Sequence, residues 1–63
     1  MDSRPTNKDI STILGITTRE VGTYYEDSER RPDGAWLIYF NYETPQRIRQ
    51  GMGGSFILLM PPK

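Results

Sequence analysis

The chain contains no cysteine and no histidine. Without cysteine it has no disulfide framework and no thiolate ligands for a metal. Without histidine it lacks the usual general base, the usual zinc-binding imidazole and any nucleophilic triad built on that residue. We therefore expect neither an enzyme nor a metal site, and no cofactor.

Long apolar runs are also missing. The first residues, MDSRPTNKD, have no apolar segment of the kind found in a signal peptide, and no run approaches the length of a membrane span. The sequence therefore predicts a cytoplasmic protein with no membrane partner. Its 63 residues are enough for one small domain, which buries only about 60% of the surface that the unfolded chain exposes. A second copy is one way to bury more.

Neither sign of charge is in excess, since eight basic residues balance eight acidic ones. The two halves differ, however. Residues 1–29 carry three cations and six acids, and residues 30–63 carry five cations and two acids. A surface that binds anions is expected mainly in the second half. The alternative is an uneven distribution without function.

The first helix is predicted to begin after Thr6. Thr6 and Asp9 have the spacing of a capping box, in which each side chain accepts a hydrogen bond from the other residue's backbone N–H. The apolar positions that follow form one stripe, and Gly15 supplies the left-handed residue that ends the helix. The stripe consists of Ile10, Ile13 and Leu14.

A second helix follows directly. Thr17 and Glu20 repeat the capping box, and Ile16 and Val21 have the spacing of a hydrophobic staple. We expect this helix to run through Tyr24 and Tyr25, although Gly22 weakens it by up to about 1 kcal/mol. Two capped helices with so short a link predict a sharp corner.

The rest of the chain predicts strands around a turn. RRPDG has turn chemistry, and AWLIYFNY is rich in aromatic and branched residues. On that strand Trp36, Ile38, Phe40 and Tyr42 should share one face. Residues 44–50, TPQRIRQ, read as a short helix capped by Thr44 and stopped by Gly51, or as the start of a hairpin around a flexible GMGG; SFILLM reads as a final strand that Pro61 and Pro62 close.

Together these segments predict a small single α+β domain. We expect a loose arm over residues 1–5, a helical hairpin over 6–28, and a β-hairpin, short helix and final strand over 29–63.

The helical corner resembles the helix-turn-helix of bacterial and phage transcription regulators. That motif has a branched residue before a small one, a Leu-Gly-Ile or Leu-Gly-Val turn, a hydroxyl cap and a branched residue in the second helix. The matching residues are Ile10, Ser11, Leu14, Gly15, Ile16, Thr17 and Val21. A looser likeness to winged-helix proteins of the MerR and phage excisionase type extends through YYE, RRPDG, WLIYF and TPQRIR. Gly22, where arginine is frequent, and the acidic EDSE depart from the pattern.

The resemblance implies binding to duplex DNA as a transcription regulator or recombination directionality factor, as a homodimer on two half-sites. Residues near the start of the second helix would read bases, and other cations would contact phosphates. The implied base-reading residues are Thr17, Thr18, Arg19 and Thr23. The implied backbone contacts are Arg30 and Arg31 on the hairpin, with Lys8, Arg47 and Arg49. The alternative is that these are solvated surface groups.

The two apolar segments AWLIYF and SFILLM are first of all candidates for the core. Because both faces of each are apolar, one face is also expected to contact a partner, most simply a second copy. The interface residues implied are Trp36, Ile38, Phe40, Phe56 and Leu58.

A second function class also fits the sequence. The segment EDSERRPDG is predicted to be a solvated loop, since its carboxylates lack the spacing of metal ligands. The chain could instead be a phage or plasmid interaction module or inhibitor. It would then bind another protein through its apolar strands or an acidic helical surface.

Overall fold

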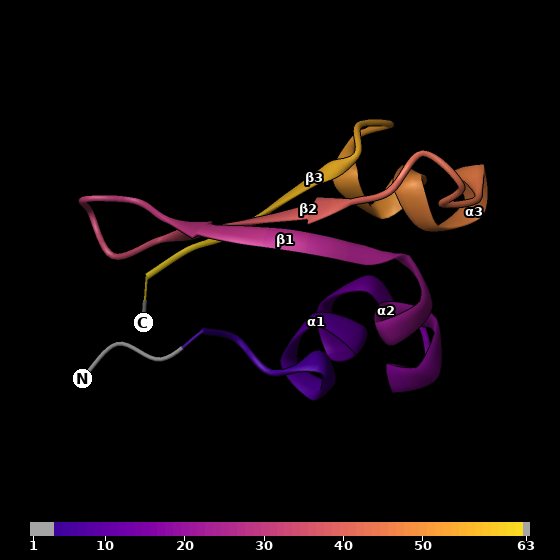
Figure 1. The fold of residues 1–63 in the computed structure, drawn as a ribbon, viewed down its shortest axis with the longest axis horizontal. Helices are drawn as coiled ribbons and strands as arrows, with labels where there is room; N and C mark the ends of the chain where they lie inside the picture. Colours follow the sequence, from indigo (N-terminus) through magenta and orange to yellow (C-terminus); the bar gives the residue numbers. More distant parts are fainter. Residues whose placement is uncertain (1–3, 63) are drawn as a thin grey trace.

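Two short helices, an antiparallel sheet and a short third helix follow one another along residues 4–62, the part of the chain that the computed structural model describes (Figure 1). The element order is α1 (Asn7–Leu14), α2 (Thr18–Tyr24), β1 (Tyr25–Arg30), β2 (Trp36–Phe40), α3 (Gln46–Arg49), the 3₁₀ turn η1 (Gln50–Met52) and β3 (Ile57–Met60). The strand order in the sheet is β1-β2-β3. The predicted α+β fold class is confirmed.

Both capping boxes form as the sequence predicts. The Thr6 N–H donates to the Asp9 carboxylate at 3.0 Å, and the Asp9 N–H donates to the Thr6 hydroxyl at 3.2 Å. At α2 the Thr17 N–H donates to the Glu20 carboxylate at 3.1 Å, and the Glu20 N–H donates to the Thr17 hydroxyl at the same distance. Each pair satisfies backbone donors that the helix itself leaves unpaired.

The corner between α1 and α2 depends on Gly15, which ends α1 with φ 69°. A side chain at this φ would be strained, so glycine is required to turn the chain. Beyond it, Ile16 packs on the apolar cluster that contains Val21. Ser11 is buried, and its hydroxyl donates to the Lys8 carbonyl at 2.8 Å.

The second helix is shorter than predicted, and the expected helical hairpin over 6–28 is wrong in its last part. The chain leaves α2 at Tyr24, and residues 25–30 form β1, which pairs with β2. The segment EDSER was predicted to be part of a solvated loop. Here Ser28 pairs with Ile38 and Arg30 with Trp36, so hydrogen bonding to an apolar neighbour overrides local preference.

The turn after β1 has the predicted chemistry. The Asp33 carboxylate accepts a hydrogen bond from the Ala35 N–H at 2.9 Å, and the Arg31 N–H donates to the Ala35 carbonyl at 2.8 Å. The following strand ends at Phe40. Tyr42 therefore does not continue the buried face as expected: it lies beyond the strand and is 88% exposed.

The segment after Thr44 forms a helix rather than a hairpin, but the helix begins and ends at other residues than predicted. Pro45 is the N-cap, and Thr44 is buried with its hydroxyl donating to the Asn41 carbonyl at 2.7 Å. The helix does not stop at Gly51. It continues as η1 to Met52, which is buried, and Gly53 at φ 70° turns the chain toward β3. The GMGG segment is therefore part of the packed structure.

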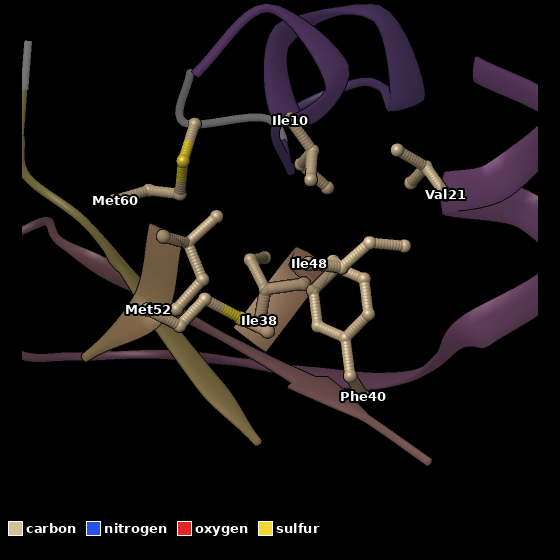
Figure 2. Packing of buried hydrophobic residues seen from close by; sticks show 8 residues of the cluster. Ile10, Val21, Ile38, Phe40, Ile48, Met52 and Met60 are labelled. Atoms are coloured by element: carbon tan, nitrogen blue, oxygen red, sulfur yellow. The ribbon is translucent and has the colours of Figure 1, made fainter. Parts of the chain in front are cut away.

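The core is one cluster to which every helix and the strands β2 and β3 contribute. Ile10 and Val21 point from α1 and α2 toward Ile38 and Phe40 on β2, and Ile48 lies among them (Figure 2). The whole buried cluster is Ile10, Val21, Ile38, Phe40, Ile48, Met52, Leu58 and Met60. It lies on the face of the sheet that α1 and α2 cover.

Residues 1–3 of the arm predicted over residues 1–5 lie outside the described part of the chain. At the other end, Lys63 also lies outside it. In the described part of the arm, the Arg4 guanidinium lies 4.8 Å from the centre of the Tyr25 ring.

Candidate nucleic-acid interface

The start of α2 presents exposed polar side chains. Thr18 and Arg19 are exposed in its first turn, and Thr23 follows Arg19 by four residues on the same side of the helix. The Thr23 hydroxyl donates to the Arg19 carbonyl at 2.9 Å, which ties it to the helix backbone. Gly22 is exposed beside them, and because it has no side chain, the helix backbone is accessible at this point.

Thr17 is exposed too, but its hydroxyl already serves the cap. It accepts from the Glu20 N–H and is 3.2 Å from the Glu20 carboxylate. Only its methyl group is left for a contact outside the chain.

Glu20 ties α2 to α3. Its carboxylate accepts a hydrogen bond from the Thr17 N–H and forms an ion pair with Arg47. The backbone hydrogen bond, followed by the Arg47 contact, lowers the pKa of the Glu20 carboxyl below 4.5. Arg47, which is predicted to contact DNA, pairs with Glu20 in this way, and its side chain remains 62% exposed.

Arg49 is also engaged within the chain. Its guanidinium donates to the carbonyls of Thr44 and Gly54 at 3.2 Å each and lies 4.8 Å from the centre of the Phe56 ring. These three contacts hold the segment between α3 and β3 in place. Arg49 therefore stabilises this segment, whether or not it also contacts DNA.

The cations of the hairpin and of α1 lie around a second region. An open groove of about 950 Å³ separates the arm and α1 from the hairpin turn, and both Lys8 and Arg30 line it. Asp9 and Asp33 line the same groove, so its charge is mixed. Arg31 lies 3.7 Å from the Asp33 carboxylate, and both groups are about half exposed.

These two regions lie at different places along the molecule. Figure 1 shows α2 near one end of the long axis and the hairpin turn at the other. The molecule extends 31 Å along that axis. Thr18, Arg19 and Thr23 are thus brought together, Lys8 and Arg30 are brought together, and the two groups are separate.

The acids that depart from the DNA-binding pattern lie away from α2. In β1, Asp27 pairs with Tyr39 and Glu29 with Leu37, positions that alternate with the buried Ile38. Their side chains therefore lie on the face of the sheet opposite α1 and α2. The sequence could not reveal this, because the segment was not recognised as a strand.

The predicted partner interface is wrong for three of its five residues. Ile38, Phe40 and Leu58 are buried in the core, so their side chains are not available to a partner. Trp36 and Phe56 are partly buried. The apolar side chains of the outer face belong instead to the alternate positions Leu37, Tyr39, Ile57 and Leu59. Both faces of these strands are apolar in sequence, so periodicity alone could not show which face is exposed to a partner.

Among residues 4–62, no helix has the length and apolar character needed to cross a bilayer. In the same range, no three acidic side chains gather into a metal-binding group. Comparison of the chain with family models, curated proteins and solved structures finds no match.

Proposed function

We propose that this protein binds duplex DNA in a sequence-dependent way, as a cytoplasmic transcription regulator or recombination directionality factor. The observation that carries the proposal is the exposed side of α2, where Thr18, Arg19 and Thr23 lie together on a helix capped at its start and braced by Arg47. A rigid helix with exposed polar residues near its N-terminus is what major-groove reading requires.

The side chains on α2 suit direct reading of bases. A guanidinium such as that of Arg19 makes two hydrogen bonds to the O6 and N7 of guanine, and a threonine methyl contacts the methyl of thymine. Each good bidentate contact discriminates against the wrong base by about 1–3 kcal/mol. With the carboxylates of Asp27 and Glu29 on the far face of the sheet, α2 approaches a phosphate backbone without facing them.

The remaining cations suit phosphate contacts. Arg30 and Arg31 lie at the end of β1, just before the hairpin turn, and Lys8 on α1 lines the same groove as Arg30. A molecule 31 Å long spans a little less than one turn of duplex, about 34 Å, so both ends contact the same site. With about three or four phosphate contacts, the affinity of a single copy is low and depends on salt, and two copies on adjacent half-sites raise it.

The experiment is a titration of labelled duplex DNA, followed by fluorescence anisotropy at about 50 mM and about 200 mM salt. We expect a slope of log affinity against log salt of about −2.7 to −3.6, since each phosphate contact contributes about −0.9. After selection of a preferred site, Arg19→Ala should reduce discrimination between that site and random duplex by roughly tenfold or more. Arg30→Ala should weaken both duplexes alike.

Thr12 gives a matched control for Thr23. Both are exposed helical threonines whose hydroxyls donate to the carbonyl four residues earlier, at 2.9 Å in each case. Replacement by alanine removes the same local hydrogen bond, but only Thr23→Ala removes a side chain from α2. If Thr12→Ala and Thr23→Ala change site preference equally, or if no duplex binds at the lower salt, the proposal is wrong.

A further inference from the structure

The outer face of the sheet carries a block of apolar side chains that residues 4–62 cover only in part, since Leu37 and Tyr39 are partly buried. Leu37 pairs with Leu59 and Tyr39 with Ile57 across the β2–β3 ladder, so these four residues form two adjacent pairs. Ile57 is 42% exposed and Leu59 is 51% exposed. Burying such a block against a partner is favourable at about 25 cal/mol per Å².

A row of carboxylates runs beside this block. Asp27 and Glu29 on β1 lie opposite Tyr39 and Leu37, and the Tyr39 hydroxyl donates to the Glu29 carboxylate at 3.2 Å. At the outward positions of the three strands, the described residues include no lysine or arginine. The outer face is therefore apolar over β2 and β3 and acidic over β1.

A hollow at one end of the face combines both properties. It encloses about 420 Å³, and Glu26 lines it together with aromatic side chains. Tyr42 and Phe56 meet edge to face there, with ring centres 5.2 Å apart. A carboxylate beside exposed rings attracts a guanidinium or ammonium group. Phe56 already binds one such group from its own chain, that of Arg49.

The free edge of β3 is poorly suited to adding another strand. Phe40 donates to the Phe56 carbonyl at 2.8 Å, so by the alternation of antiparallel pairing Ile57 directs its N–H and C=O away from β2. Both groups are occupied by the Ser55 hydroxyl, at 3.1 Å and 2.9 Å. Two prolines follow the strand. Leu59 also directs its N–H and C=O to this edge, but the Ser55 hydroxyl before it and the prolines after it leave only this one residue for pairing, so we place the partner on the face rather than on the edge.

A second copy of the chain is also a poor occupant. Face-to-face packing of two copies would bring together two faces with the same carboxylates and without a cation to pair them. Burial of unpaired carboxylates is costly. The charge of the face thus selects a partner that differs from this chain.

We infer that the outer sheet face is a docking site for a segment of another protein that carries arginine or lysine side chains between aliphatic ones. The aliphatic side chains lie on the block formed by Leu37, Tyr39, Ile57 and Leu59. The cations pair with Asp27 and Glu29, and one enters the hollow beside Glu26. Because this face is opposite α1 and α2, a partner binds here while α2 is engaged elsewhere. The inference does not depend on DNA binding.

The test uses three short synthetic peptides: one alternates leucine and arginine, one leucine and glutamate, and one serine and arginine. Binding to the full chain is measured by titration calorimetry and located by amide chemical shifts. We expect the leucine–arginine peptide to bind at least roughly tenfold more tightly than either other peptide, with shifts concentrated at residues 37–39 and 57–59.

Two matched pairs of variants distinguish binding at this face from nonspecific binding to other exposed surfaces. Leu59→Asn is compared with Ile13→Asn, because the two side chains are 51% and 54% exposed but lie on different surfaces. Glu26→Lys is compared with Glu43→Lys, since both carboxylates are exposed. The first member of each pair should weaken binding by roughly fivefold or more, and the second by less than about twofold.

Equal binding of the leucine–glutamate peptide, equal effects within either pair, shifts on α1 or α2, or absence of binding would overturn the inference. So would sedimentation showing that the free chain dimerises and that Leu59→Asn, but not Ile13→Asn, abolishes the dimer. In that case the face is an interface between two copies.

Discussion

At the scale of single residues, Glu20 joins several features of the molecule. Its carboxylate caps α2 and pairs with Arg47 of α3, so one side chain links the two helices in addition to their packing on the core. Both contacts favour the charged form, which lowers its folded-state pKa below 4.5. Such a group stabilises the fold above its unfolded-state pKa, and this contribution is lost as the pH falls through the folded-state value.

We therefore expect the melting temperature to fall as the pH drops below about 4.5, and to fall less in Glu20→Gln, which retains a capping side chain without the charge. Circular dichroism melts between neutral and strongly acidic pH measure this. Glu43→Gln, on an exposed turn, is the control and should follow the unmodified chain. Identical acid dependence in Glu20→Gln and the unmodified chain would show that this carboxylate does not couple to folding.

Tyr39 gives a corresponding effect at high pH. Desolvation, with the hydrogen bond to Glu29 and its charge, raises the pKa of the Tyr39 hydroxyl above 10.0. A raised folded-state pKa stabilises the fold below the unfolded-state value, and this contribution is lost as the pH rises through the folded-state value. In an ultraviolet titration of the phenols, Tyr39→Phe should remove a component that ionises late. Tyr42→Phe, which leaves that component in place, is the comparison.

At the scale of elements, α2 is short for an independent helix and contains Gly22 in its middle. A methyl group at this position would meet only the Asn7 amide nitrogen, at 3.7 Å, so packing does not require glycine. Its backbone is also in the ordinary helical region, since Gly22 is not among the glycines with positive φ. The fold therefore gives no reason for glycine at this position, and the DNA binding that we propose would give one if the duplex backbone approached α2 closely.

Gly22→Ala should accordingly stabilise the protein by about 0.5–1 kcal/mol, through higher helix propensity and a less flexible unfolded chain. Gly15→Ala is the opposite case, because φ is 69° there, and it should destabilise by about 1–2 kcal/mol. Urea denaturation measures both. If DNA approaches α2 closely, Gly22→Ala also weakens binding to the preferred duplex while it raises stability. A stabilised variant with unchanged DNA affinity would show that glycine is not needed for close approach.

At the scale of the whole molecule, local signals predicted the parts that depend on neighbours in sequence. Both capping boxes, Gly15 and the Pro-Asp-Gly turn follow from short-range chemistry and were confirmed. The strand β1 was missed because its residues, YEDSER, are mostly polar and acidic, and only the hairpin pairing with β2 makes them a strand. The face of the sheet was assigned wrongly because alternation gives two sets of positions without saying which one the helices cover.

The same limit applies to the candidate interface. Arg47 and Arg49 looked like available cations, and only the fold shows that Glu20 and Phe56 engage them. Arg19 remains exposed, as expected. Charge counted along the sequence also did not show that the carboxylates of Asp27 and Glu29 lie on the outer sheet face.

The assignment of the two faces can be tested by stability. Ile38 lies at the centre of the sheet, fully buried between the helices and η1, whereas Leu59 is half exposed on the outer face. Ile38→Ala should cost about 2–5 kcal/mol, from lost burial and the cavity that remains. A domain of this size has a total stability of roughly 3–9 kcal/mol, so Ile38→Ala should remove a large part of it. Leu59→Ala should cost less than about 1 kcal/mol.

Guanidinium denaturation, followed by tryptophan fluorescence, compares the two variants directly. A large loss for Leu59→Ala and a small one for Ile38→Ala would mean that the helices cover the other face. The carboxylates of β1 would then lie beneath α1 and α2, where they would repel a phosphate backbone approaching α2. Both proposals would fail together, because each rests on which side of the sheet these side chains occupy.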